Sequence, residues 1–292
     1  KLVVVTVINK HKSSPNQKLT ETFDDFLVSH NTPKLTFEQL PFDHPLFIMY
    51  SSGTTGVPKC IVHGAGGTLI QHLKEHQLHV NLKPGDRMLF YTTCGWMMWN
   101  WLVTALASEV SLILFDGSPF YPKPESLFDI AEEEKINVLG VSAKYISAIE
   151  KANVRPIKTH NLEHLNTILS TGSPLSHESF KFTYREVKTN LCLSSISGGT
   201  DILSCFVLGN PCLPVWEGEI QCRGLGMAVE IWDDKGDSII ANKGELVCTK
   251  PFPSAPLYFW DDLDNEKYLS SYFKTLPGIW AQGDYGLSLI HI

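Results

Sequence analysis

The sequence lacks the features that mark several common classes of protein. Its seven cysteines include no Cys-x-x-Cys pair, which argues against a disulfide framework or a zinc site of that type and favours reduced thiols in the cytosol. The formal net charge is −7, so the chain has no basic excess with which to bind nucleic acid nonspecifically. Hydrophobic residues make up 43% of the chain, which argues against disorder and indicates a substantial buried core.

An uninterrupted apolar run long enough to span a membrane is also missing. Residues 88–115 contain a single charge, Glu109, and have the length of a membrane span. Polar residues and Gly95 interrupt this stretch, and "RMLFYT" and "VSLILF" have the character of strands on either side of a helix, "WNWLVTALAS". We therefore expect a buried strand–helix–strand unit and no membrane span.

The N-terminus has neither a methionine nor a signal peptide. The apolar run in "KLVVVTVINK" is too short for a signal sequence and has no small-residue cleavage site. It predicts a buried strand. We expect the chain to begin inside a longer protein, with residues 1–40 forming the tail of a preceding α/β unit.

Strands and helices alternate from residue 41 to residue 213. Examples are "HPLFIMYSS", "INVLGVSA" and "NTILSTG" as strands, and "AKYISAIEKA" as a helix. This order predicts an α/β fold of layered, largely parallel sheets. In "GTLIQHLKEHQLHVNL" the apolar residues Leu69, Ile70, Leu73 and Leu78 predict an amphipathic helix. From residue 214 to residue 292, short strands with Gly and Asp turns predict a smaller β-rich subdomain.

The stretch "YSSGTTGVPK" is a polar, glycine-rich loop that ends in a lysine, a composition typical of phosphate binding. The P-loop pattern G-x-x-x-x-G-K-[ST] does not match it. Pro58 occupies the second glycine position, and Cys60 follows Lys59 in place of Ser or Thr. The stretch therefore predicts a phosphate-binding loop that is not a Walker A motif.

The stretch "HLKEH", residues 72–76, matches the H-x-x-E-H pattern of some zinc hydrolases, and His79 follows one turn later. Short patterns of this kind often match by chance. A catalytic zinc also needs a third protein ligand, which the sequence does not identify. We therefore favour a solvated face of the predicted helix over a zinc hydrolase.

Two other groups of residues have more than one interpretation. The tryptophans and methionines of "GWMMWNW" suit core packing, although one or two could line an apolar ligand pocket. Asp201, Glu245 and Asp284 lie beside glycines and, taken singly, suit turns or caps. Only a larger pattern would assign them to a site.

Such a pattern exists, because "YSSGTTGVPK" resembles the signature loop of the adenylate-forming enzymes. This superfamily includes acyl-CoA synthetases, firefly luciferase and peptide-synthetase adenylation domains. Four further stretches resemble its other motifs in the same order: "STGSPL", "SGGTD", "KGELVC" and "WAQGD". The matches extend from residue 50 to residue 284, nearly the whole chain apart from its ends.

The resemblance implies a two-step reaction on a carboxylic acid. The carboxylate attacks the α-phosphate of ATP to give an acyl-adenylate and pyrophosphate, and the thiol of coenzyme A then displaces AMP. It implies ATP, Mg²⁺ and coenzyme A as cofactors and small molecules as the partners, with no nucleic acid and no membrane span. The compartment implied is the cytosol, where such an enzyme would serve lipid synthesis.

The resemblance also implies roles for the loop residues. Backbone N–H groups and hydroxyls beside a cation can neutralise the departing pyrophosphate. Lys59 would supply the charge. The other loop positions that carry the likeness are Ser51, Ser52, Gly53, Thr54, Thr55 and Gly56.

Three further sets of contacts follow from the other motifs. Thr200 would contact the α-phosphate, and Asp201 would bind or orient Mg²⁺ where the family usually has glutamate, one methylene longer. A bridging water suits the shorter side chain. Asp284 would accept hydrogen bonds from both ribose hydroxyls. The adenine would lie against one turn, formed by Gly172, Ser173 and Pro174.

The size of the acid can also be argued from the resemblance. Acetate-specific relatives carry a bulky tryptophan before the Thr-Glu motif, whereas this chain has Gly198 and Gly199 there. These glycines would leave room for a short acid larger than acetate, and acetoacetate fits. Candidates for the opposite wall are Trp96, Met97 and Met98. The alternatives are another short-chain acyl-CoA synthetase and a nucleotide-binding remnant without activity.

Two departures from the family pattern remain. The family continues beyond the Gly-Asp motif into a hinge and a small domain with a lysine important for adenylation, but the final "GLSLIHI" does not match that continuation. We therefore expect a truncated isoform, a partial gene model or a fragment. Glu109 stands where the family usually has glycine.

Overall fold

The computed structural model describes residues 3–5, 20–22, 34–51 and 58–289. It divides into two compact units, residues 1–40 and residues 41–292. In the first unit, β1 (Val3–Val5) pairs in parallel with β2 (Thr20–Thr22). This confirms a strand in the N-terminal apolar run. The assignment of residues 1–40 to a preceding α/β unit stays a prediction.

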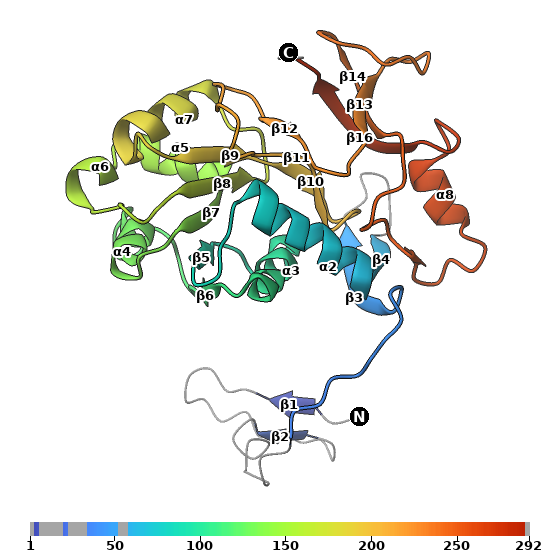
Figure 1. Ribbon diagram of the computed structural model, residues 1–292, viewed down its shortest axis with the longest axis horizontal. Coiled ribbons are helices and arrows are strands. Elements are labelled where there is room, and N and C mark those ends of the chain that lie inside the picture. The colour runs from blue at the N-terminus through green and yellow to red at the C-terminus, as the bar shows by residue number, and fades with distance from the viewer. Residues whose placement is uncertain (1–2, 6–19, 23–33, 52–57, 290–292) are drawn as a thin grey trace. The chain divides into compact units, whose positions relative to one another are not determined.

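A five-stranded parallel sheet forms the centre of the second unit (Figure 1). The strand order is β6-β5-β7-β8-β9, and every neighbouring pair is parallel. The five strands are β5 (Arg87–Phe90), β6 (Ser111–Ile113), β7 (Val138–Ser142), β8 (Thr167–Thr171) and β9 (Cys192–Ser195). The predicted α/β class with a parallel sheet is confirmed.

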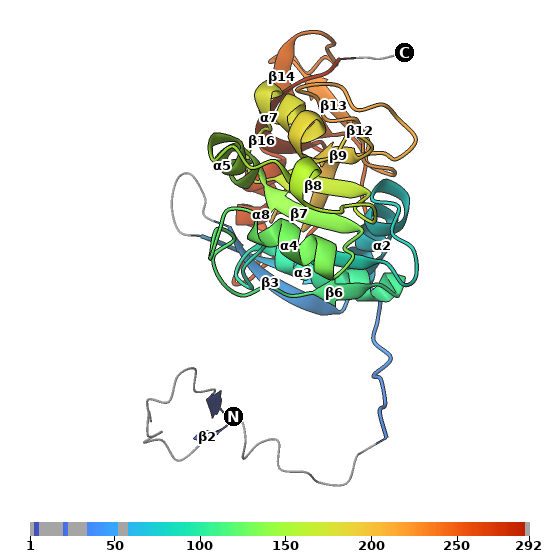
Figure 2. The same cartoon turned by 90° about the vertical axis from the view of Figure 1, so that its left-hand side faces the viewer.

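Hydrophobic cores cover both faces of this sheet. Because successive strand residues point to opposite faces, Leu139 and Val141 pack into one core and Val138 into the other. Figure 2 shows α5 and α2 on opposite sides of the sheet. The helices that follow the strands are α3 (Met97–Thr104), η2 (Ala105–Ser108), α4 (Ser126–Glu133), α5 (Ala143–Lys151), α6 (Pro156–Thr159), α7 (His177–Phe182) and η3 (Thr183–Val187).

The second unit also contains three small antiparallel sheets. They are ordered β15-β4-β3, β10-β11-β12 and β13-β14-β16. Their strands are β3 (Pro45–Ser51), β4 (Lys59–Gly64), β10 (Ser197–Gly199), β11 (Ser204–Leu208), β12 (Cys222–Arg223), β13 (Val229–Trp232), β14 (Lys243–Cys248), β15 (Tyr258–Phe259) and β16 (Trp280–Leu287). The β-rich texture after Pro214 is thus present. Helix α8 (Glu266–Tyr272), which the sequence did not predict, interrupts it.

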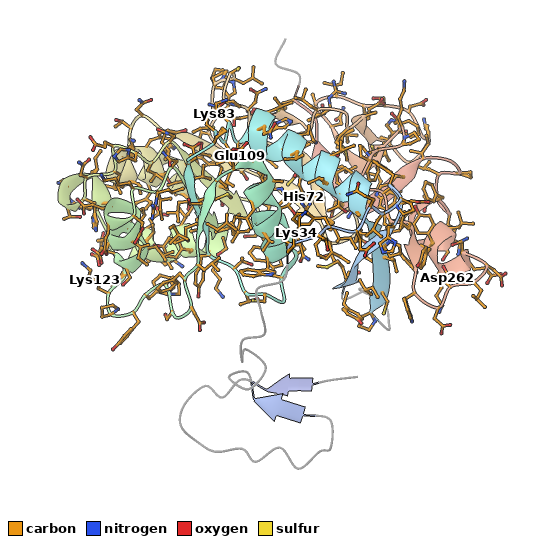
Figure 3. The ribbon with its side chains drawn as sticks, turned by 60° about the horizontal axis from the view of Figure 1, so that its bottom comes forward. Lys34, His72, Lys83, Glu109, Lys123 and Asp262 are labelled. Atoms are coloured by element: carbon orange, nitrogen blue, oxygen red, sulfur yellow. The ribbon has the colours of Figure 1, made fainter. Side chains whose placement is uncertain are left out.

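The apolar stretch of residues 88–115 folds as the strand–helix–strand unit that the sequence predicted. It forms β5, then α3 and η2, then β6. Among the described residues, no helix is long and apolar enough to cross a membrane. Glu109, labelled in Figure 3, has φ 59° and ψ 33° at the turn before β6. Glycine adopts this left-handed conformation without the steric cost of a side chain, which accounts for the family's usual residue at this position.

The segment after β4 forms a helix whose buried face is the opposite of the predicted one. It consists of α2 (Ala65–Lys74) and a wider π-helical turn, η1 (Glu75–His79). The apolar Leu69, Ile70 and Leu78 are 42%, 50% and 55% exposed. The buried face carries Gln71, His72, Glu75, His76 and His79. The predicted solvated face for "HLKEH" is therefore wrong, because His72, Glu75 and His76 are fully buried, and His72 and Glu75 find hydrogen-bond partners inside the molecule (His72 in Figure 3).

Candidate active site

The candidate site begins at the carboxyl ends of the parallel strands, where ligands bind in open α/β sheets. The turn of Gly172, Ser173 and Pro174 follows β8 directly and is exposed. Gly172 has φ +86°, a conformation that favours glycine. A Cβ atom at this residue would lie 3.8 Å from the indole ring of Trp96. The structure thus brings the predicted adenine turn next to one predicted pocket residue.

The hairpin of β10 and β11 carries the next two predicted residues, Thr200 and Asp201. The ammonium group of Lys59, at the start of β4, forms an ion pair with the Asp201 carboxylate. The side chains of Lys59 and Asp201 are 27% and 14% exposed, so the pair is shielded from bulk water. The last residue of the signature loop and the last residue of the "SGGTD" motif are therefore in contact.

Tyr272 of α8 completes this cluster. Its hydroxyl donates a hydrogen bond to Asp201 Oδ1 at 2.5 Å. The ring of Tyr272 stacks on Trp280, with ring centroids 3.7 Å apart, and Lys59 Nζ lies 4.8 Å from the Tyr272 centroid. Burial and the negative charge of Asp201 raise the pKa of Tyr272, so its hydroxyl stays protonated and donates. Sequence reasoning missed both aromatic residues. Trp280 stood inside the quoted "WAQGD", but nothing in the pattern indicated Tyr272.

Asp284 lies on β16, near the same carboxylate. Desolvation and the negative charge of Asp201 both raise the pKa of Asp284. Glu245 of β14 accepts a hydrogen bond from the Gly283 backbone N–H at 2.5 Å, next to Asp284 in the chain. Glu245 thus holds the backbone of β16 next to Asp284, the residue predicted to bind the ribose.

Two neighbouring carboxylates that repel each other suit a divalent cation. The described residues hold no cluster of three or more His, Cys, Asp or Glu side chains that could bind a metal by themselves. Mg²⁺ commonly uses one or two carboxylates and completes its shell with phosphate oxygens and water. Asp201, with Asp284 close enough to feel its charge, fits that requirement.

The two glycines of the predicted acid pocket have different surroundings. A Cβ atom on Gly198 would lie 1.9 Å from the backbone oxygen of Ser204. The pairing of β10 with β11 therefore requires a glycine at this position, whatever the size of the acid. A Cβ atom on Gly199 would instead meet Gln282 Nε2 at 3.5 Å, an ordinary contact. Gly199 is thus the position where added side-chain volume tests the pocket.

The remaining predicted residues fall into two groups. Met97 and Met98 are 7% and 3% exposed and pack in the core beneath the sheet, as expected for most of the "GWMMWNW" side chains. Ser51 is paired with Lys59 between β3 and β4, so the two ends of the signature loop are adjacent. Ser52, Gly53, Thr54, Thr55 and Gly56 lie outside the described residues.

A separate cavity lies at the opposite end of the parallel strands. It has a volume of about 550 Å³, and Val138, Thr167 and Cys192, at the amino ends of their strands, line it. It shares no residue with the candidate site. The size of a cavity alone therefore does not locate the chemistry in this fold.

The histidines of the H-x-x-E-H pattern face the protein interior. His72 Nε2–H donates to the carbonyl of Leu203 at 2.5 Å. His79 donates from Nδ1 to the carbonyl of Gly209 at 2.8 Å and accepts the Leu225 N–H at Nε2. His76, the second histidine of the pattern, has no hydrogen-bond partner at either ring nitrogen within the part of the chain that the structure describes, and it packs edge-on against Trp101. The described residues show no cluster of metal-binding side chains around these histidines. The zinc-hydrolase alternative therefore loses the motif on which it rested.

The parallel sheet, with the turn after β8 and the Lys59–Asp201 pair beyond it, defines a protein of the α/β class. The family model "AMP-binding enzyme" matches residues 1–258, and the chain belongs to this family. The family-level resemblance is therefore confirmed.

Individual relatives agree with this assignment. The chain is 53% identical over 290 residues to acetoacetyl-CoA synthetase of Gallus gallus, covering 98% of this chain and 44% of the relative. It is 44% identical to malonamoyl-CoA synthetase of Penicillium aethiopicum, over 93% of this chain and 38% of the relative. The solved acetoacetyl-CoA synthetase from Streptomyces lividans superimposes with a TM-score of 0.90 at 41% identity, covering 98% of this chain and 44% of that one. The chain thus spans less than half the length of these relatives.

Proposed function

We propose that this chain takes part in the ATP-dependent activation of a short carboxylic acid, acetoacetate, to its acyl-adenylate and then to its coenzyme A thioester. The observation that supports it most is the cluster of Lys59, Asp201 and Tyr272, which joins three separate parts of the sequence. The names of the relatives support the choice of acid, since several are acetoacetyl-CoA synthetases.

The residues divide the work of adenylation by their chemistry. Lys59 would place a positive charge at the end of the signature loop, where negative charge develops on the departing pyrophosphate. Thr200 would donate its hydroxyl to the α-phosphate. Asp284 would accept hydrogen bonds from the ribose hydroxyls, and the turn at Gly172 would lie against the adenine. The loop residues that would surround the β- and γ-phosphates are Ser51, Ser52, Gly53, Thr54, Thr55 and Gly56.

Asp201 would hold Mg²⁺ directly or through a water molecule. When bound, the ion would neutralise phosphate charge. In the structure Asp201 Oδ1 accepts from both Lys59 and Tyr272. These two donors hold the carboxylate in one orientation, which lessens the reorganisation needed when ATP and its metal ion arrive. Coenzyme A would enter at the second step, as the thiol that displaces AMP.

A second candidate for the acyl group is the malonamoyl group, because the Penicillium relative is named a malonamoyl-CoA synthetase. We expect Gly199→Val to lower the ratio of acetoacetate to acetate activity by about tenfold or more, since each methylene in a pocket changes discrimination by 10–200-fold. The ratio is measured by acid-dependent exchange of labelled pyrophosphate into ATP, with Gly199→Ala as the smaller step. An unchanged ratio in both variants would show that this glycine does not face the acid.

The same exchange assay tests the proposed function itself. With the unaltered chain, we expect exchange to be fastest with acetoacetate and slower with butyrate, propionate and acetate. ATP binding is measured in parallel by calorimetry. Fastest exchange with another acid would favour another short-chain acyl-CoA synthetase. ATP binding without exchange would favour a nucleotide-binding remnant. The absence of both ATP binding and exchange would contradict the proposal.

The compartment proposed for this activity is the cytosol. All seven cysteines are free in the structure, and five of them are exposed or half-buried: Cys60, Cys94, Cys192, Cys212 and Cys222. Free thiols of this kind persist where glutathione and thioredoxin keep them reduced.

A further inference from the structure

The buried polar face of α2 and η1 runs beside the segment that carries Thr200 and Asp201. We propose that His63, His72 and Glu75 are positioning residues, which fix residues 199–205 so that Thr200 and Asp201 face the nucleotide. This inference rests on the proposed function for its catalytic meaning. The "HLKEH" pattern then acts by supporting the site, with no metal involved.

Two imidazoles hold the backbone of this segment from below. His63 Nε2–H donates to the carbonyl of Thr200 at 3.0 Å. His72 Nε2–H donates to the carbonyl of Leu203 at 2.5 Å. Both rings are fully buried. Each imidazole therefore satisfies a carbonyl within three residues of Asp201 that would otherwise lose its hydrogen bond to water.

Glu75 holds the start of β11. Its Oε1 accepts the Ser204 hydroxyl and the Cys205 backbone N–H, the latter at 3.2 Å. The same carboxylate accepts the amide of Gln71 at 3.1 Å and, at Oε2, the indole N–H of Trp101 at 2.8 Å. Four donors therefore converge on one fully buried carboxylate, and two of them belong to the start of β11.

The contacts follow the same order along both segments. His63 reaches Thr200, His72 reaches Leu203, Glu75 reaches Ser204, and His79 reaches Gly209 beyond the end of β11. The π-helical turn of η1 places Glu75 and His79 on the buried side together with His72. A continuous set of bonds, unlike a single contact, sets the register of one element against the other.

This register matters because β4 also carries the cation of the site. Lys59 and His63 belong to the same strand, and the two side chains reach Asp201 and the neighbouring Thr200. The distance between the Lys59 charge and the Asp201 carboxylate is therefore set from two sides. A displacement of about 1 Å in catalytic groups can lower a rate by about 100-fold.

Apolar side chains would provide burial alone at lower cost. Burying a carboxylate and imidazoles is costly unless their hydrogen bonds are made. Nδ1 of His72 has no hydrogen-bond partner among the described residues, so the ring contributes one directed bond, to Leu203. The bonds of His63 and His72, and two of those to Glu75, end on residues 200–205. Positioning of that segment is the property that they share.

Two substitutions of His72 separate positioning from burial. In His72→Gln the amide nitrogen can reach the position of Nε2 and donate to Leu203, whereas in His72→Asn it is too short. We expect the dissociation constant for MgATP to rise about tenfold in His72→Asn and to stay within about threefold of the unaltered chain in His72→Gln, the loss expected for one directed bond.

A second matched pair removes one bond each from Glu75. Ser204→Ala removes the bond to the segment, and Trp101→Phe removes the bond to the core helix α3. Hydrogen exchange by mass spectrometry reports both without any need for activity. We expect faster exchange in residues 199–205 for Ser204→Ala and His72→Asn. Trp101→Phe should speed exchange in α3 and leave the affinity for MgATP unchanged, although it should lower the melting temperature more than Ser204→Ala does.

The outcomes separate this inference from the proposed function. If the unaltered chain binds MgATP and His72→Asn binds it equally well, the positioning role is overturned. If the unaltered chain does not bind MgATP, the proposed function fails, and hydrogen exchange decides the inference. Faster exchange confined to residues 199–205 in His72→Asn, with recovery in His72→Gln, then supports it, and unchanged exchange overturns it.

Discussion

Lowering the pH from 7 to 4.5 is expected to unfold this chain, because four buried histidines must gain protons. Burial lowers the pKa of His63 to about 4. Burial also lowers the pKa values of His72, His76 and His79. In the unfolded chain a histidine titrates near 6.5. Between these values the unfolded state binds more protons than the folded state. Stability is therefore fully present above pH 6.5 and is lost as the pH falls towards 4.

The expected size of this effect follows from the number of protons. Each histidine that stays neutral only in the folded state contributes a slope of about 1.4 kcal/mol per pH unit. His63 alone, with its pKa lowered to about 4, would remove about 3 kcal/mol over two pH units, and the other three act in the same direction. The total stability of a typical domain is about 5–15 kcal/mol. Asp284 acts in the opposite direction, since its pKa is raised, but it is one group against four.

Urea unfolding followed by tryptophan fluorescence at several pH values measures this slope. We expect His76→Phe to lower the slope by about one proton, because the His76 ring is fully buried against Trp101, with ring centroids 4.2 Å apart. The exposed His44 provides the matched control as His44→Gln. Equal slopes in the two variants, or a slope below one proton in the unaltered chain, would contradict the explanation.

Replacing Lys59 by methionine is expected to lower pyrophosphate exchange by about 100-fold or more. The variant removes the cation that we propose lies next to the departing pyrophosphate, and the loss of one such preorganised group typically costs about 10²–10³ in rate. It also leaves the shielded Asp201 carboxylate without its cation, so the free energy of unfolding should fall by about 1–3 kcal/mol.

The double variant Lys59→Met, Asp201→Asn separates these two effects. Without the carboxylate there is no unpaired charge, so stability should recover, while exchange should stay low. Lys123→Met is the matched control, because its ion pair with Asp129 at 2.9 Å is exposed, with side chains 51% and 42% accessible (Lys123 in Figure 3). An exposed pair of this kind contributes about 0–1 kcal/mol. Exchange in Lys59→Met as fast as in Lys123→Met would exclude a catalytic role for Lys59.

Local pattern was sufficient for most of the secondary structure. The strands at Val138–Ser142 and Thr167–Thr171 are short runs without a charged residue, and the first four residues of each are buried, as expected for strands covered on both faces. Helix α5 follows the apolar spacing of its own sequence. Helix α8 was not predicted, because its seven residues are too few to show an apolar repeat of helical period.

The buried face of α2 could not be predicted from spacing alone. Its apolar residues, among them Leu69 and Ile70, have helical spacing and are nevertheless exposed. The face that is buried carries His72 and Glu75, whose partners, Leu203 and Ser204, lie about 130 positions further along the chain. Periodicity reports the polarity of side chains, and it contains no information about which distant polar groups will satisfy them.

The amino-acid sequence by itself determined the α/β class, the parallel strands and the order of five family motifs, because those depend on local polarity and on short words. Only the tertiary structure decided that Lys59, Asp201 and Tyr272 form one cluster and that His72 and Glu75 of "HLKEH" bond to the neighbouring segment from inside. It also showed that strand pairing requires Gly198, which leaves Gly199 as the glycine where added volume can be tested. The physical reason is that hydrogen bonds and steric limits act between residues that are neighbours in space, whatever their separation along the chain.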